Sequence, residues 1–371
     1  MLKRSNLSDQ IIAILRKEIL RAFEPGQRMP AIRDMADRFN VSKNTLREAL
    51  SALVHENLVE RRPGSGMYVS DRIKGRHVAV LAERDISDPH TSYFYRRAPQ
   101  LVVRFLRAHD VPVRLYAGHI PAGDDSPRPL TCTEFLKSVE GHQLSGVVAF
   151  APENTFPQWL EPLRTQHVPV VGMSEAYDYG VIFDYRGLVP MGVEYLLRHS
   201  RRRIAMIEHH WTPDRRTVYL EAFQSAMGAV GVDINPNWIR RSLNPCSPGA
   251  GWEDFRAIWA EGREKPDGLL VCDDNLFPSI AMAILQMGIR VPEDLQVATH
   301  FNKGSGMINP FPVGKLEFDP EACARAMGEM LLKLMHEEPV ETRRVILPCE
   351  LVETDGQIHS RTALHAENGL E

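Results

Sequence analysis

Residues 29–69 constrain the fold of this chain more than any other segment. Apolar residues recur at helical spacing in residues 30–39 and again in residues 42–53, and only Asn40-Val41 lies between the two runs. Residues 58–69 then form two strand-like runs around a tip that contains two glycines. The segment therefore predicts a helix, a tight turn, a second helix and a β-hairpin.

A further helix precedes this segment. Ser8-Asp9 are followed by Ile11, Leu15 and Ile19 on one helical face, and Pro25-Gly26 stops that helix. Pro30 is expected to open the second helix of the region, since proline is favoured at the first helical position. Residues 1–70 thus predict a small three-helix domain with a hairpin.

The third helix separates an apolar face from a polar face. Ser42 is a good N-cap for it. Four apolar residues are expected to face the core, namely Leu46, Ala49, Leu50 and Leu53. Lys43, Asn44 and Arg47 are left on another face near the N-terminal end of the helix.

These polar residues suit a nucleic-acid surface. Arg or Lys can bond a guanine edge and Asn an adenine edge, and each good contact contributes about 1–3 kcal/mol of discrimination. Arg33, one helix earlier, is placed to contact a phosphate without reading sequence. Gly64 and Gly66 at the hairpin tip allow the backbone to approach phosphates or the minor groove. The order of these features predicts a winged helix-turn-helix that binds double-stranded DNA.

The charge distribution supports this interpretation. The whole chain has a formal net charge of −4, but residues 1–76 hold 15 Lys and Arg against 9 Asp and Glu. The remainder holds 29 against 39. A basic head on an acidic body is expected when only the head contacts phosphates.

Other motifs are informative by their absence from the sequence. The five cysteines are widely spaced with no C-x-x-C, which disfavours disulfides and zinc and fits a reducing cytoplasm. The first residues lack the apolar region of a signal peptide, and no run reaches 18 apolar residues, so no membrane association is expected. No nucleotide-binding, metallohydrolase or serine-hydrolase motif is found, so no cofactor, metal or catalytic residue is predicted.

The head resembles the GntR family of regulators. The resemblance spans about 60 residues and includes Pro25-Gly26, Val41-Ser42, Thr45-Leu46-Arg47 and Gly64-Ser65-Gly66-Met67-Tyr68-Val69. It implies that DNA is contacted by Arg33, Lys43, Asn44, Thr45, Arg47 and Gly64. Two positions depart from the family pattern: Ala31 replaces a usual Ser, and Lys43 replaces a usual Arg whose planar fork Lys cannot reproduce.

The body alternates strand-like apolar runs with helical patterns. The expected strands are residues 77–82, 112–116, 146–150, 168–172, 203–207, 268–272 and 295–298. Strands alternating with helices imply parallel sheets covered on both faces. Residues 77–355 exceed what one such sheet usually needs, so two lobes with a cleft are predicted, with ligands bound beyond the carboxyl ends of the strands.

The body resembles the effector region of LacI/GalR regulators, which is related to periplasmic binding proteins. The carrying segments are residues 168–171, 183–184, 195–204, 269–297 and a closing strand at 347–352. A GntR head on such a body is the architecture of arabinose-repressor-like regulators. The fold class is thus predicted as α/β, with an N-terminal winged helix-turn-helix followed by a two-lobed periplasmic-binding-protein-like domain with parallel sheets.

The resemblance also implies an effector pocket. Asp274 would hydrogen-bond a sugar hydroxyl, Tyr93 and Phe94 would cover an apolar sugar face, and Asp85 and Asp184 would lie nearby.

The pocket departs from the family at two places. Tyr219 aligns with the family's ligand-binding Arg, with Arg215 just upstream, and His300 and Asn302 follow the strand where the family has Gly-Phe-Asp. The resemblance thus implies a retained pocket for a small sugar or sugar-like metabolite other than a common hexose.

These observations predict a ligand-responsive repressor that binds a palindromic operator as a homodimer. The expected divisions are a DNA-binding domain (1–70), a linker (71–76), an effector-binding and dimerisation domain (77–355) and a tail (356–371). Two alternatives stay open at this point. The body is an enzyme acting on a small metabolite, or it is a dimerisation module without a ligand.

Overall fold

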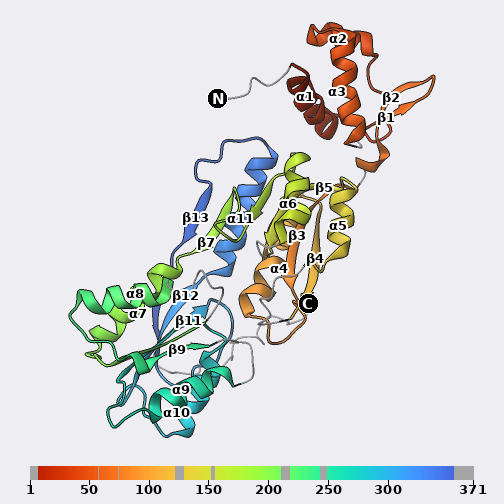
Figure 1. Ribbon diagram of the computed structural model, residues 1–371. Helices are drawn as coiled ribbons and strands as arrows, with labels where there is room; N and C mark the ends of the chain where they lie inside the picture. Colours follow the sequence, from red (N-terminus) through yellow and green to blue (C-terminus); the bar gives the residue numbers. More distant parts are fainter. Residues whose placement is uncertain are drawn as a thin grey trace, which may run out of the picture.

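The computed structural model describes residues 7–56, 58–73, 75–121, 129–151, 155–209, 218–242 and 249–354. These residues form an elongated molecule with a small helical head at one end and two α/β lobes following it in line (Figure 1). The predicted fold class is therefore confirmed.

The head contains three helices and a hairpin. The helices are α1 (Leu7–Ala22), α2 (Ile32–Phe39) and α3 (Lys43–His55), and strands β1 (Val59–Arg62) and β2 (Gly66–Val69) pair antiparallel. The residues expected to face the core are buried, namely Ile11, Leu15, Ile19, Leu46, Ala49, Leu50 and Leu53. The helical apolar spacing thus identified the core of the head correctly.

The second helix begins two residues later than the sequence suggested. Pro30 lies outside α2, because Ala31 has an extended backbone and acts as the N-cap, with its carbonyl oxygen accepting from the Met35 N–H at 3.0 Å. Asn40 ends α2 in the left-handed conformation, with φ of 51°. This turn places α3 directly after α2, as the two-residue spacing predicted.

The segment between head and body packs against both. The short 3-10 turn η1 (Asp71–Ile73) brings Ile73 onto the apolar core of the head. Arg76 donates a hydrogen bond to the Leu144 backbone oxygen in the body. Burial lowers the pKa of Arg76 to about 10, although the Glu56 carboxylate at the end of α3 opposes this shift. Ile73 therefore contacts the head, and Arg76 contacts the body.

The first lobe is built on a six-stranded sheet in the order β13-β7-β6-β5-β3-β4. Its strands are β3 (His77–Arg84), β4 (Val113–Ile120), β5 (Leu144–Phe150), β6 (Val170–Gly172), β7 (Gly180–Phe183) and β13 (Arg344–Leu347), and every pair is parallel.

Helices cover both faces of this sheet. The helices α4 (Tyr93–Ala108) and α11 (Pro320–Met335) pack on one face, and α5 (Thr133–Glu140) and α6 (Phe156–Thr165) pack on the other. Successive residues of β3 therefore contribute to two different cores.

The second lobe has a sheet in the order β14-β12-β11-β10-β8-β9. Its strands are β8 (Ile204–His209), β9 (Ile239–Ser242), β10 (Gly268–Val271), β11 (Gln296–Asn302), β12 (Val313–Phe318) and β14 (Glu350–Thr354). The helices are α7 (Tyr185–Arg198), α8 (Val218–Ala229), α9 (Ala250–Ala260) and α10 (Phe277–Gln286). A parallel sheet was expected, but strand β14 pairs antiparallel with β12, so the sheet is mixed.

The chain passes between the two sheets three times, after β7, after β12 and between β13 and β14. The last crossing corrects one expectation. Residues 347–352 were predicted as a single closing strand, but Leu347 ends β13 in the first sheet and Glu350 begins β14 in the second. Pro348 lies between them and cannot donate a ladder hydrogen bond, which explains why the strand divides there.

Candidate functional site

The candidate DNA-binding face lies on α2 and α3 of the head. Ser42 caps α3 by accepting a hydrogen bond from the Thr45 N–H at 3.1 Å, and its hydroxyl also lies 2.8 Å from the Thr45 hydroxyl. Lys43, Asn44 and Arg47 are exposed around this end of the helix. An Arg47 Nη1 hydrogen bond to Asn44 Oδ1 at 3.4 Å holds these two side chains together. The helix thus presents three base-reading side chain types beside its positive N-terminal end.

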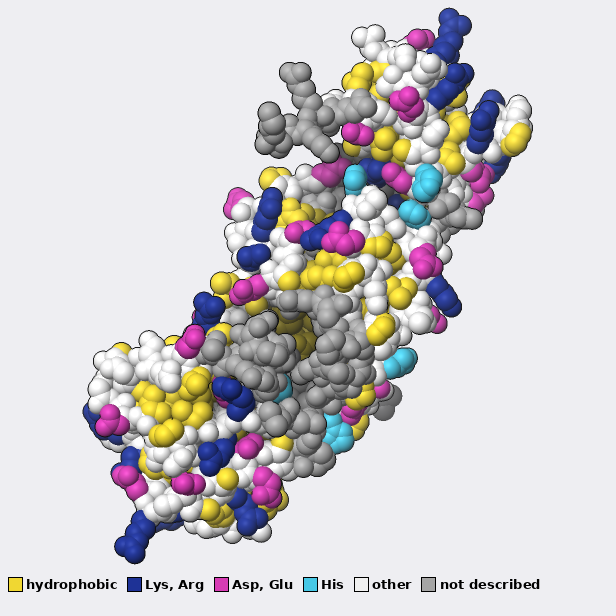
Figure 2. All heavy atoms as spheres, in the orientation of Figure 1, with side chains coloured by type: hydrophobic (Ala, Val, Ile, Leu, Met, Phe, Trp, Pro, Cys, Tyr) yellow, Lys and Arg dark blue, Asp and Glu magenta, His cyan; other side chains and the backbone are white. Residues whose placement is uncertain are grey.

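The hairpin forms the wing beside this helix. Gly64 and Gly66 are exposed and have positive φ, at 73° and 124°, so side chains are disfavoured at both positions. The Arg62 guanidinium stacks over the Tyr68 ring at 4.2 Å, which stiffens the strands that carry the tip. Lys and Arg side chains gather at the outer end of the head and along the wing in Figure 2.

Two features of this face concern single arginines. Arg33 is exposed on α2, on the element that precedes the reading helix. Arg28 was missed by the sequence reasoning, because it lies in an irregular segment before α2. A β-bridge from Arg28 to Tyr68 brings it to the wing, where its Nε would lie 3.6 Å from a Cβ at Gly66. Only the tertiary fold adds this basic group to the wing.

The candidate effector pocket lies between the two lobes, at the carboxyl ends of their strands. The pocket is lined by Ser92, Phe94, Tyr95, Phe183, Tyr185, Tyr219, Cys272, Asp273, Asp274, Asn275, His300 and Asn302. This position agrees with the rule for ligands of parallel sheets.

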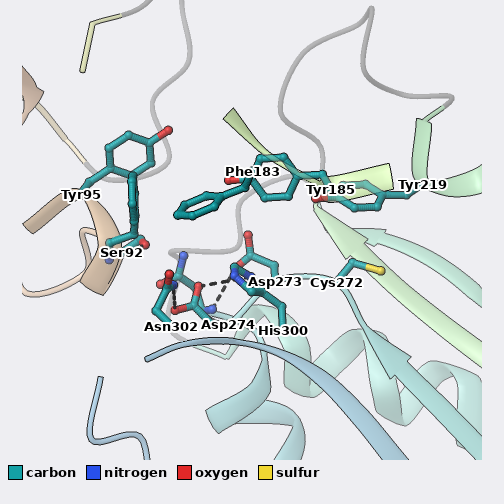
Figure 3. A pocket seen from close by; sticks show the side chains of 12 residues that line it. Ser92, Tyr95, Phe183, Tyr185, Tyr219, Cys272, Asp273, Asp274, His300 and Asn302 are labelled. Atoms are coloured by element: carbon teal, nitrogen blue, oxygen red, sulfur yellow. Dashed lines mark hydrogen bonds and ion pairs between the residues drawn. The ribbon is translucent and has the colours of Figure 1, made fainter. Parts of the chain in front are cut away.

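Four side chains of the second lobe form the polar side of the pocket (Figure 3). Asp273 and Asp274 follow β10, and His300 and Asn302 lie in the neighbouring strand β11. Asn302 donates its amide to Asp274 Oδ2 at 2.8 Å, and His300 Nδ1 lies 3.8 Å from Asp274 Oδ1. The buried atoms His300 Nε2 and Asn302 Oδ1 have no hydrogen-bond partner among the described residues.

Burial perturbs the titration of this cluster. Loss of solvent, with a further contribution from the Asp274 carboxylate, raises the pKa of Asp273 to about 8. Burial also lowers the pKa of His300, although Asp274 opposes this change. His300 is therefore neutral at physiological pH, and the cluster holds no positive charge of its own.

Aromatic rings form the opposite side of the pocket (Figure 3). The Phe94 and Phe183 rings meet edge to face with centroids 5.0 Å apart, and Tyr185 and Tyr219 do so at 6.4 Å. Phe183 also stacks on Phe318 at 4.4 Å, which joins the end of β7 in one lobe to the end of β12 in the other. The pocket thus combines a polar, acidic side with an apolar, aromatic side.

The predicted effector residues divide into two groups. Phe94, Tyr219, Asp274, His300 and Asn302 line the pocket together.

Tyr93, Asp85 and Asp184 are not among the residues that line the pocket. Tyr95 lines the pocket in place of Tyr93, and Asp85 instead accepts hydrogen bonds from Ser87 in a surface turn. Asp184 caps α7 by accepting from the Gly187 N–H at 2.9 Å. Arg215 lies outside the described residues.

Sequence reasoning missed Asp273, Tyr95, Phe183 and Tyr185. Phe183, Tyr185 and Asp273 lie at the end of a strand or within two residues of it, which is a usable signal, whereas Tyr95 lies in the first turn of α4. The apolar runs of the sequence mark the strands themselves and not the residue that follows each strand.

The described residues contain neither a membrane-spanning helix nor a metal-binding cluster. No described helix has both the length and the apolar composition needed to cross a membrane. Within the same residues, no group of three or more His, Cys, Asp or Glu is arranged to hold a metal ion.

Comparison with known proteins assigns both parts of the chain. The profile of bacterial regulatory proteins of the gntR family matches residues 7–69, and the profile of the periplasmic binding protein-like domain matches residues 193–355. The protein is a transcription regulator with a GntR-type helix-turn-helix head and a periplasmic-binding-protein-like effector domain of the LacI type.

Individual relatives have the same character. The arabinose metabolism transcriptional repressor of Halalkalibacterium halodurans is 20% identical over 74% of this chain and 74% of that protein. The transcriptional repressor PurR of Pasteurella multocida is 24% identical over 44% of this chain, and the match spans about half (48%) of that repressor. These relatives are regulators rather than enzymes.

A solved structure confirms the fold. The complex of the transcriptional regulator CelR with cellobiose has a TM-score of 0.61 and 17% identity, and it covers 88% of this chain and 99% of that one.

Proposed function

We propose that this protein is a transcriptional repressor that binds a palindromic operator as a dimer. A small sugar or sugar-like metabolite in the pocket between the lobes releases it from DNA. In this proposal residues 1–70 bind DNA, and residues 77–355 bind the effector and dimerise. Residues 71–76 link these two domains.

The pocket between the lobes is the observation that carries the proposal. Its lining comes from both sheets, so a ligand contacts both lobes at once. A ligand changes an equilibrium only if its affinity for the two states differs, and a site shared between lobes meets this condition when the lobes move relative to one another. The packed segment around Ile73 and Arg76 provides a route from the first lobe to the head.

The relatives support two parts of the proposal, namely that the protein represses transcription and that its effector is carbohydrate-like. The Halalkalibacterium halodurans protein is named a repressor of arabinose metabolism, and the CelR structure contains cellobiose. We carry over from them the repressor role and a carbohydrate-like effector, but neither particular sugar.

Operator binding tests the DNA half of the proposal. Arg47→Ala removes a side chain proposed to read a base, and the loss of about 1–3 kcal/mol weakens operator binding roughly 5- to 150-fold. Fluorescence anisotropy with a labelled fragment of the neighbouring promoter measures this change. Arg104→Ala, at an exposed position on α4 of the body, is the matched control and leaves the affinity unchanged. A wild-type protein that forms no salt-sensitive, sequence-dependent complex contradicts the proposal.

Release of DNA by the effector tests the effector half of the proposal. Asp274→Ala removes the carboxylate held by Asn302, so the variant binds the operator normally but needs much more effector for release. The same anisotropy assay, titrated with effector, gives the concentration for half release. Asp178→Ala, on an exposed carboxylate of the first lobe, is the control. If Asp274→Ala releases DNA at the wild-type effector concentration, the pocket is not the effector site.

A further inference from the structure

The polar side of the pocket holds two adjacent carboxyl groups. Asp273 and Asp274 are consecutive and buried, with 4% and 7% of their surface exposed. No Lys or Arg occurs among the described residues that line the pocket.

The same side also offers unused hydrogen-bonding atoms. Asn302 spends its amide N–H on Asp274, so its Oδ1 faces the pocket as an acceptor without a described partner. His300 Nε2 also has no hydrogen-bond partner among the described residues, and both residues are more than nine-tenths buried. Buried polar atoms are normally hydrogen-bonded, so an occupant of the pocket is expected to satisfy them. The oxygens of the two carboxyl groups and of the Asn302 amide can all accept, so an occupant with several hydrogen-bond donors fits this side of the pocket.

The aromatic side favours positive charge as well as apolar surface. The faces of Phe and Tyr rings are electronegative and attract cations that lie within about 6 Å. In Figure 3, Phe183 and Tyr185 lie across the pocket from Asp273, so a group between them meets ring faces and carboxylates together. A metal ion is a poor candidate, because the described residues provide no group of three ligands for it.

We propose that the ligand is a cation, a hydroxylated amine of about the size of an amino sugar. Its ammonium group lies between Asp273 and Asp274, and its carbon skeleton packs on Phe183 and Tyr185. The three N–H donors of an ammonium group match the two carboxylates and Asn302 Oδ1. An ammonium group between the two side chains favours the ionised form of Asp273 and displaces its proton, whereas a neutral sugar provides no opposite charge and an acidic sugar adds repulsion. The inference rests on the proposed function, because it names the chemical class of the effector.

A panel of matched sugars tests the charge of the ligand. Glucose, glucosamine and glucuronate share one carbon skeleton, as do galactose, galactosamine and galacturonate, and each is added at 10 mM to the full-length protein. We expect the two amines to raise the Tm, because a ligand that binds only the folded state stabilises it. The neutral and acidic members are expected to leave the Tm unchanged.

Variants connect that shift to the acidic pair. Asp273→Asn keeps the shape of the side chain but removes its charge, and we expect the affinity for the binding amine, measured by calorimetry, to fall at least tenfold. Asp178→Asn, at the exposed carboxylate paired with Arg164, is the matched control and keeps the wild-type affinity. An unchanged amine affinity in Asp273→Asn overturns the proposal.

The remaining outcomes separate this inference from the proposed function. A Tm shift given only by neutral or acidic sugars overturns the cationic ligand and leaves the effector-responsive repressor standing. The absence of a shift with either amine also overturns the cationic ligand. Failure of operator binding in the anisotropy assay contradicts the proposed function, whatever the panel shows.

Discussion

At the scale of single residues, Asp273 illustrates how position changes chemistry. The same side chain on the surface ionises near pH 4, but here burial and the adjacent Asp274 raise its pKa to about 8. Its Oδ1 accepts from the Asn275 N–H at 2.8 Å, which partly opposes the shift. The other titratable side chains that line the pocket are Asp274, His300, Cys272, Tyr95, Tyr185 and Tyr219. Asp273 therefore changes its charge near pH 8 rather than near pH 4.

Asp273→Asn is predicted to gain stability relative to wild type as the pH rises from 6.5 to 8.5. A carboxyl whose folded pKa is raised binds its proton more tightly in the folded state. Its favourable contribution is complete below the unfolded pKa near 4 and is lost as the pH rises through the folded value. The amide of Asn does not titrate, so the Tm difference between variant and wild type grows over this range. Ligand-free thermal melts measure it, and a constant Tm difference contradicts the raised pKa.

At the scale of elements, the head depends on the cap of α3. Ser42 accepts the Thr45 N–H that the helix cannot satisfy itself, and it stands next to the three polar side chains proposed to read bases. The cap therefore fixes where the helix begins and which residues its first turn presents.

Ser42→Ala is predicted to destabilise α3 by about 1 kcal/mol, because the cap hydrogen bond is lost. Hydrogen exchange of α3 amides in the full chain measures this as roughly fivefold faster exchange, provided the helix opens locally. Ser51→Ala, at an exposed position inside α3, serves as the control and slows exchange or leaves it unchanged, since Ala is the better helix former. Equal exchange rates in the two variants would mean that Ser42 does not stabilise the helix.

Elements also show how far the sequence reasoning reached. The helices of the head were predicted well, because caps, turns and apolar spacing are local signals. Strand β12 was missed because Lys315 and Glu317 interrupt its apolar residues, and β7 because it has only four residues. The division between β13 and β14 depends on which sheet each half joins, and no local signal gives that.

At the scale of the whole molecule, α10 bears on the proposed dimer. Pro278, Met282 and Leu285 form an exposed stripe at helical spacing, and the last two are 59% and 51% exposed. A single winged head makes few base contacts, so a second copy is the occupant that the proposed operator binding requires. This stripe is therefore a candidate contact surface for the dimer proposed above.

Met282→Glu is predicted to weaken the dimer, because a charge is buried in an apolar contact. Sedimentation velocity at micromolar concentration measures the change from dimer to monomer. Val230→Glu, at an exposed apolar residue after α8, is the control and leaves the wild-type state intact. A Met282→Glu variant that sediments like wild type places the dimer contact elsewhere.

The sequence by itself determined the class of the head, the alternation of strands and helices in the body, and several pocket residues such as Asp274 and His300. These features depend on local chemistry, namely apolar periodicity, capping and the residue after a strand. The tertiary structure decided which aromatic rings face the acidic pair, that Asp184 is a helix cap and Asp85 a turn residue, and that Arg28 joins the wing. Those outcomes depend on how residues distant in the chain are brought together, and a single sequence carries no direct signal of that.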